Sequence, residues 1–264
     1  MRYIENFTIG ADPELFIINE KTGKVISSIG LIPGKKGNPY RAEDMPEGFG
    51  LEIDNILAEF NIPPVTDEIS FINNIQYMKD YINNFVKQKN SDLGIKCIAS
   101  MHVDDDQLQS EEAREFGCCP DYNVYTESEN PRPKGDRTNT RSAGFHIHLG
   151  YNNPTIDQSL RMIKYMDMYL GIPSVIEDPD TKRRSLYGKA GAFRLTGYGL
   201  EYRVLSSAMM KDTDSLKKVW KGIEKSINAF NNGKDTIPRE YVINAINNSD
   251  IDLADKLIKQ YRLA

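Results

Sequence analysis

Four short segments place acidic, histidine or arginine side chains among apolar neighbours. The first contains Asp12 and Glu14, which are two residues apart in an extended stretch. Side chains at this spacing share one face of a strand. Two carboxylates on one face repel each other unless cations lie between them. This pair therefore indicates either a cation site or, in the simpler interpretation, an exposed strand face.

A second group of acids interrupts the apolar stretch at residues 51–60. It consists of Glu52, Asp54 and Glu59, and Glu59 is flanked directly by Ala58 and Phe60. Unpaired charges are costly to bury. Taken singly, any of these acids could instead pair with a lysine on a neighbouring strand.

The third and fourth segments supply imidazoles and arginines. Two of the three histidines, His146 and His148, share a strand face at residues 144–150, and Glu201 stands two residues before Arg203. A lone buried histidine is usually a core residue, but this pair favours a ligand or phosphate-contact role. Carboxylates with one or two imidazoles suit magnesium or manganese better than zinc.

Arginines accompany these acids near the end of the apolar segments. They are Arg183, Arg184, Arg194 and Arg203. Magnesium and manganese ions commonly bridge the phosphates of a nucleotide, and arginines offset the charge that builds up during phosphoryl transfer. The sequence contains no GxxxxGK[ST] loop, so a nucleotide has to be held in another way.

The elements that must position these residues follow from periodicity. We expect strands at residues 7–10 and 15–18, with Pro13 restricting this strand to an edge or a bulge. Further extended segments are expected at residues 25–29, 49–60, 95–103 and 142–150, with a hairpin at 192–196 and 200–206. Helices are expected at residues 67–89, 156–170, 213–231, 239–247 and 251–261, with the first capped near Asp67 or Thr66 and the second near Thr155. Residues 30–37 and 111–139 are predicted as loops, the first of them basic.

Extended segments with few strand–helix–strand alternations favour an α+β fold, in which helices pack on one face of an antiparallel sheet. We expect a single domain over residues 1–264. The net charge of −5 argues against nucleic acid as a partner. The chain has no apolar leader or membrane-spanning run, which predicts a cytoplasmic protein without a membrane partner. Its three cysteines are too few for a disulfide framework.

These segments, in this order, resemble the carboxylate–amine ligase superfamily that includes glutamine synthetase and glutamate–cysteine ligase. The resemblance is strongest to the short phage-encoded amidoligases (COOH-NH2 ligases), and it spans about three quarters of the chain. The matching segments are GADPELF, EIDNILAEFNIPP, FGCCPDYNVY, SAGFHIHLG, RRSLYGKAGAFR and GLEYRVLS. One such segment is weak support, whereas six in collinear order are strong.

The resemblance implies a curved antiparallel sheet, like the catalytic domain of glutamine synthetase, whose concave face binds ATP and two or three magnesium (or manganese) ions. The metal ligands that it implies are Asp12, Glu14, Asp54, Glu59, His146 and Glu201, with Glu52 as an alternative to Asp54. His148 is implied to face nucleotide or phosphate, as are Arg184, Arg194 and Arg203. Asp12 departs from the family, in which a glutamate is usual. The chain is also too short for the additional amino-terminal domain of glutamine synthetase, so ring assembly is not expected, although another oligomer is possible.

The chemistry implied by the resemblance has two steps. A substrate carboxylate attacks the γ-phosphorus of ATP to give an acyl phosphate, and an amine then displaces phosphate to form an amide or isopeptide bond. Both substrates could be small molecules or peptides, and a host cytoplasm is implied if the chain is phage-encoded. Cys118 and Cys119 are interpreted as structural, although the FGCCPDYN loop could line the acceptor pocket. Two alternatives remain: a metal-dependent hydrolase, and a catalytically silent nucleotide- or metal-binding protein.

Overall fold

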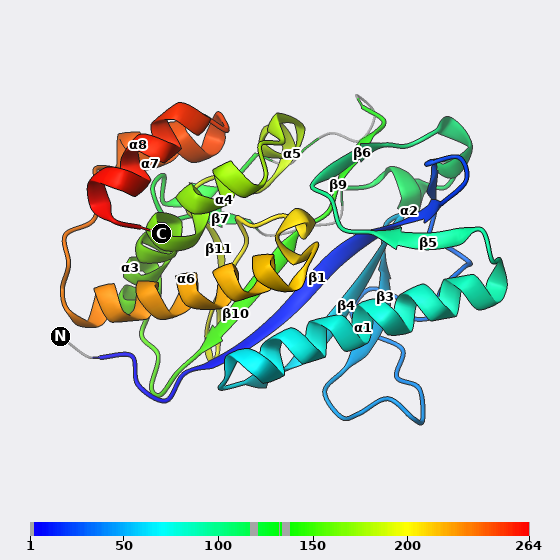
Figure 1. Ribbon diagram of the computed structural model, residues 1–264, viewed down its shortest axis with the longest axis horizontal. Coiled ribbons are helices and arrows are strands. Elements are labelled where there is room, and N and C mark those ends of the chain that lie inside the picture. The colour runs from blue at the N-terminus through cyan, green and yellow to red at the C-terminus, as the bar shows by residue number, and fades with distance from the viewer. Residues whose placement is uncertain (1–2, 117–120, 132, 134–137, 264) are drawn as a thin grey trace.

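The computed structural model describes residues 3–116, 121–131, 133 and 138–263. They form an α+β fold in which helices pack against a large, open antiparallel sheet (Figure 1). Across this sheet the strands are β3 (Gly50–Asp54), β4 (Leu57–Val65), β1 (Thr8–Asn19), β10 (Phe145–Gly150), β12 (Gly199–Tyr202), β11 (Ala192–Thr196), β7 (Tyr122–Asn123) and β8 (Ser128–Glu129). The predicted fold class is confirmed.

Shorter strands extend this arrangement. β2 (Val25–Ile26) and β5 (Leu93–Lys96) both pair with the second half of β1. β6 (Ser100–His102) and β9 (Thr140–Ser142) form a separate two-stranded sheet. Each of the strands expected at residues 95–103 and 142–150 is therefore divided in two. β5 and β10 belong to the main sheet, whereas β6 and β9 belong to the separate sheet.

Pro13 does not restrict its strand to a sheet edge, which was one of the two expected alternatives, and the irregularity in the β1–β4 pairing falls between Ile9 and Ala11, shortly before Pro13. β1 runs through Pro13 without a break and lies between β4 and β10. Ala11 pairs with Ile62 and Glu14 with Glu59, so Pro13 falls between paired positions on the β4 side, while the Glu14 amide donates to Gly144 at 2.9 Å. The missing N–H of Pro13 is thus accommodated inside the sheet.

The extended segment expected at residues 49–60 is a hairpin of β3 and β4. Asn55 lies in the turn with φ of 57°, a left-handed conformation that asparagine tolerates better than most residues. β4 then continues through Pro63 and Pro64, which were expected to end it. Because the chain reverses at Asn55, acids from β3 and β4 face each other across the hairpin.

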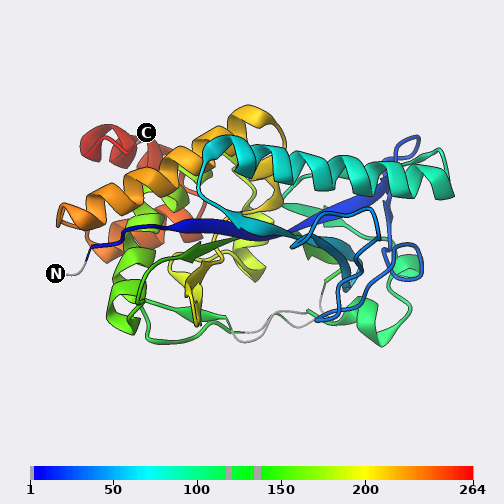
Figure 2. The ribbon, with the colours of Figure 1, turned by 90° about the horizontal axis from the view of Figure 1, so that it is seen from below.

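Helices cover one face of the main sheet. Figure 2 shows α1 (Glu68–Lys89) and α6 (Thr213–Asn231) on the same side of β1. Buried side chains from the strands, such as Ile147, Leu149 and Leu200, join the core with them. Asp67 caps α1 by accepting from the Ser70 amide, as predicted. The last helices, α7 (Arg239–Asn247) and α8 (Ile251–Tyr261), also begin and end where the sequence placed them.

The middle helix is less regular than expected. α3 (Ile156–Met166), capped by Thr155, passes into a π-helical segment, Asp167–Gly171, and then into α4 (Ile172–Glu177). Short helices that the sequence did not predict are α2 (Glu111–Arg114), α5 (Thr181–Leu186) and the 3-10 turns Asp105–Gln107 and Ser207–Met210. None of the helices in the described ranges is both long and apolar enough to cross a membrane.

Candidate active site

Strand pairing places the predicted site residues on one face of the sheet. Asp12 lies opposite His146 across β1 and β10, and His148 lies opposite Glu201 across β10 and β12. Residues directly opposite in an antiparallel pair share a face, as do residues two apart in one strand. The neighbouring positions Ile147 and Leu200 enter the core on the other face. The acids and imidazoles therefore project away from the helices.

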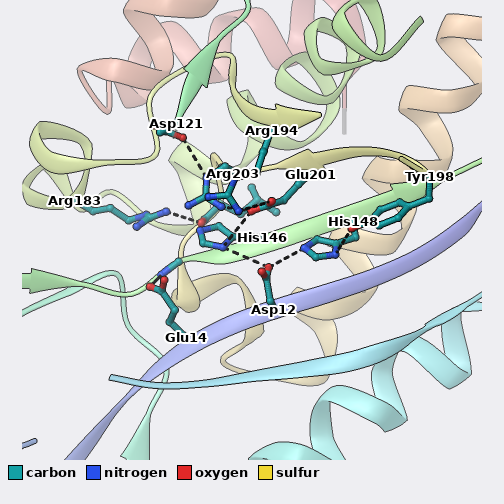
Figure 3. A network of polar contacts seen from close by, with 12 residues as sticks. Asp12, Glu14, Asp121, His146, His148, Arg183, Arg194, Tyr198, Glu201 and Arg203 are labelled. Carbon is teal, nitrogen blue, oxygen red and sulfur yellow. Dashed lines mark hydrogen bonds and ion pairs between the residues drawn. The ribbon is translucent and has the colours of Figure 1, made fainter. Parts of the chain in front are cut away.

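The first cluster on this face, called here the histidine group, consists of Asp12, His146 and Glu201. Each offers a ligand atom within 4.8 Å of the other two. The Asp12 carboxylate oxygen Oδ1 lies 3.4 Å from His146 Nδ1 and 3.1 Å from His148 Nε2 (Figure 3). These three atoms are buried, yet none has an aligned hydrogen-bond partner among the described residues. Converging ligand atoms without hydrogen bonds are what a cation site offers.

The second cluster, called here the acidic group, consists of Glu14, Asp54 and Glu59, whose oxygens also approach within 4.8 Å of one another. Glu14 accepts from the Gly144 amide at 2.6 Å. Burial raises the pKa of Glu59 well above its usual value, and the nearby charges of Asp12 and Glu14 raise it further. Burial and the Asp54 charge also raise the pKa of Glu14. Three carboxylates so close together favour a proton or a cation among them.

The hairpin explains which acid of β3 joins this cluster. Glu52 lies directly opposite Glu59, but its carboxylate accepts from the Gly37 amide at 2.9 Å. Asp54 instead approaches Glu14 and Glu59 and accepts from Lys36 Nζ at 2.7 Å. Of the two alternatives that the sequence left open, the geometry favours Asp54.

Two of the predicted arginines contact the histidine group. Arg203 is buried, forms an ion pair with Glu201, and directs its Nε to Asp121 at 3.2 Å (Figure 3). Arg194 reaches the other Glu201 oxygen at 3.0 Å from β11. Both guanidinium groups therefore flank Glu201, which the family resemblance implies is a metal ligand.

The structure does not bring Arg184 to this face. Its guanidinium donates to the carbonyl groups of Gly188 and Val204 and to the Ser174 hydroxyl. Burial lowers its pKa to about 10, and Arg183 adds to this effect. The neighbouring Arg183 lines the cavity beside the two clusters instead. Adjacent helical residues project about 100° apart, so the sequence pair could not show which arginine faces the site.

His148 lies at the margin of the histidine group. Its Nε2 faces Asp12, and its Nδ1 is 2.9 Å from the hydroxyl of Tyr198, whose ring stacks beside it. Burial alone lowers the pKa of His148, but the combined effects of Asp12 and the Glu201 charge outweigh burial and raise the pKa. A raised pKa favours a cationic imidazole, which is suited to contact an anionic ligand.

A narrow cavity joins the two clusters and adds residues that the sequence reasoning missed. Its lining includes Glu14, Asp54, His146, Arg183, Arg203 and Asp121. Asp121 directly precedes β7 and Tyr198 lies in the β11–β12 turn, so neither carries a periodic signal, although Asp121 falls within the quoted FGCCPDYN segment. The predictions for Cys118 and Cys119 lie outside the described residues.

Sequence comparison agrees with the geometry. Residues 135–221 match the sequence model of a protein family described as phage phiEco32-like COOH.NH2 ligase-type 2. The matched region contains β10, α5 and the β11–β12 hairpin, and with them His146, His148 and Glu201. It begins after Asp12, Glu14, Asp54 and Glu59, which strand pairing brings to the same face. A comparison with curated proteins finds no match.

Proposed function

We propose, from the similarity of this chain to the phage-type carboxylate–amine ligases, that it is a ligase that uses ATP and divalent cations to join a carboxylate to an amine. The observation that carries the proposal is the pair of ligand clusters on one sheet face, flanked by buried arginines. The reaction would take place in the cytoplasm, where ATP and magnesium are available.

The donor atoms suit hard divalent cations. Oxygen ligands dominate both clusters, and the single imidazole of the histidine group is compatible with magnesium or manganese. The facing atoms of Asp12 and His146, which are buried without an aligned hydrogen bond among the described residues, support the fit together with the raised pKa of Glu59. Asp12, His146 and Glu201 would hold one ion, and Glu14, Asp54 and Glu59 another. Bound cations would neutralise and align the phosphates of ATP.

The chain's own residues would then orient the reactants. Arg203 and Arg183, both buried beside the cavity, offer fixed donors to the transferring phosphoryl group. The substrate carboxylate oxygen bonds to the γ-phosphorus as the bond to the β-phosphate oxygen breaks, which releases ADP. The amine then bonds to the acyl carbon, loses a proton, and expels phosphate. No protein nucleophile is required.

The proposal is tested by a screen of ATP consumption over paired acids and amines, with mass spectrometry of the products. We expect ADP release that needs both partners and magnesium, together with one amide per ADP. Phosphate release without an amide product would indicate a hydrolase, whereas binding of nucleotide without turnover would indicate a silent binding protein. Omission of magnesium is the control.

The substrates are proposed only by class. The classes proposed for the carboxylate and amine donors are small molecules, peptide termini and protein side chains. A screen should therefore include free amino acids, short peptides and polyamines. A product found with only one class would narrow the assignment at once.

A further inference from the structure

The basic loop at residues 30–37 reaches the acidic group in a defined geometry. Lys35 and Asn38 exchange backbone hydrogen bonds of 3.2 and 2.8 Å, so Lys36 and Gly37 form the tip of a tight turn. The Gly37 φ of 75° is the left-handed conformation that such a tip requires.

The edge of β3 anchors this turn. Tyr40 and Leu51 exchange backbone hydrogen bonds of 2.7 and 3.0 Å, so the returning chain lies beside the strand. A Cβ at Gly34 would meet the Leu51 carbonyl at 2.2 Å, which shows how closely the loop approaches β3. The tip is therefore held in place by backbone contacts, and its position does not depend on the lysine side chain.

Both tip residues contact acids of β3. The Gly37 amide donates to Glu52, and the Lys36 ammonium lies 2.7 Å from Asp54 Oδ1. Asp54 is almost fully buried, with 6% of its side chain exposed, whereas 53% of the Lys36 side chain is exposed. One ligand of the acidic group is thus already occupied by a positive charge that can withdraw into solvent.

We propose that Lys36 is an internal competitor of the divalent cation at the acidic group. Its ammonium satisfies Asp54 before a cation binds and leaves that carboxylate when one arrives. The inference deepens the proposed function and rests on its second cation position. A monovalent charge on a flexible stem suits this exchange, because a half-exposed ion pair is weak and its lysine is readily rehydrated.

The test is manganese binding to the intact chain, measured by calorimetry on the wild type, on Lys36→Gln and on Lys35→Gln. Lys35 is exposed and lies in the same turn. Its replacement by Gln changes the net charge by the same amount as Lys36→Gln. Removal of a competitor worth no more than a surface ion pair should tighten manganese binding about three- to fivefold in Lys36→Gln. Lys35→Gln should stay within about twofold of the wild type, since it tests only the general loss of positive charge.

Thermal unfolding supplies an independent measurement. In chelator, Lys36→Gln should melt below the wild type, because Asp54 has lost its partner, and saturating manganese should abolish the difference. Equal affinities for the two variants, or a gap that persists in manganese, would overturn the competition. If no protein binds manganese, the cation sites of the proposed function themselves are wrong.

Discussion

Arg203 holds two carboxylates together, Glu201 and Asp121. Asp121 directly precedes β7 and is 82 residues from Arg203 in sequence, so this pair also ties the start of β7 to the end of β12. A guanidinium can serve both partners through different nitrogen atoms, whereas an ammonium is a single point charge. The role proposed for Arg203 at the phosphoryl group therefore depends on its planar shape as well as its charge.

Arg203→Lys should retain the charge but lose the aligned donors. We expect turnover to fall far more than ATP affinity, because the loss of one donor to developing charge typically costs ~2.7–4 kcal/mol of transition-state stabilisation. Turnover and nucleotide affinity are measured at saturating magnesium. If Arg203 only orients Glu201, excess magnesium should restore full activity, and the phosphate role would then be excluded.

At the scale of elements, β3, β4 and β1 set three glutamates side by side. Glu59 lies directly between Glu52 and Glu14 in the pairing of these strands. Like charges directly opposite one another destabilise a sheet. The arrangement is thus unfavourable for folding without a proton or a cation, which is a common feature of sites selected for binding.

Glu59→Gln should separate folding from binding. Without divalent ions we expect it to stabilise the fold by about 1 kcal/mol, because one of the repelling charges is gone. With magnesium it should lose the stabilisation that the wild type gains. Unfolding midpoints in chelator and in magnesium measure both effects, with Glu224→Gln on the exposed face of α6 as the charge-matched control. A variant that melts below the wild type in chelator would contradict the repulsion.

The π-helical segment carries a different buried acid. Asp167 accepts from the Tyr202 hydroxyl at 2.7 Å, and Tyr202 lies on β12 between Glu201 and Arg203. Burial raises the pKa of Asp167 from 3.8 to about 7, against the hydrogen bonds of Tyr202 and Tyr125. The folded state therefore retains this proton at pH values where the unfolded chain releases it.

The stability of the fold should consequently fall as the pH rises from about 4 to 7, by up to about 4 kcal/mol from this group. Asp167→Asn keeps the shape and remains neutral, so the difference in unfolding free energy between wild type and variant should change over this window. Denaturant unfolding across the pH range measures it. Asp235→Asn, at an exposed position, should leave the pH profile unchanged. A parallel profile for Asp167→Asn would contradict the assignment.

Periodicity was sufficient for the regular helices but not for the strand boundaries. The spacing of apolar residues placed α1, α6, α7 and α8 correctly, since each buries one face. The β3–β4 hairpin was missed because its turn at Asn55 is too short to interrupt an apolar run. The six candidate ligands were identified from the sequence, but only strand pairing shows that they divide into two clusters. The choice of Arg183 over Arg184 depends on the orientation of α5, which no local pattern specifies.

At the scale of the whole molecule, the site is assembled from distant parts of the chain. β1 and the β3–β4 hairpin supply the acidic group, and the region after β9 supplies the imidazoles and Glu201. A cation bound to the folded state alone should stabilise the entire assembly by mass action, by roughly 2.7 kcal/mol at a hundredfold excess over its dissociation constant.

Removal of divalent ions should therefore lower the unfolding midpoint. Calorimetric scans with magnesium and nucleotide, with magnesium alone and with chelator measure the effect. The Glu201→Ala variant, which lacks one proposed ligand, should respond less to magnesium than the wild type does. An unchanged midpoint in all three conditions would count against a site for several cations.

β1 contributes one carboxylate to each cluster, Asp12 to the histidine group and Glu14 to the acidic group. Two residues along a strand advance by about 7 Å, so the backbone of β1 alone fixes the distance between the two proposed cation positions. No rearrangement of β3 or β12 can alter that interval, because both clusters are tied to the same backbone. A one-residue insertion between Asp12 and Glu14 would turn one of the carboxylates toward the helices. The spacing between the two proposed cations is thus set by a tripeptide with proline at its centre.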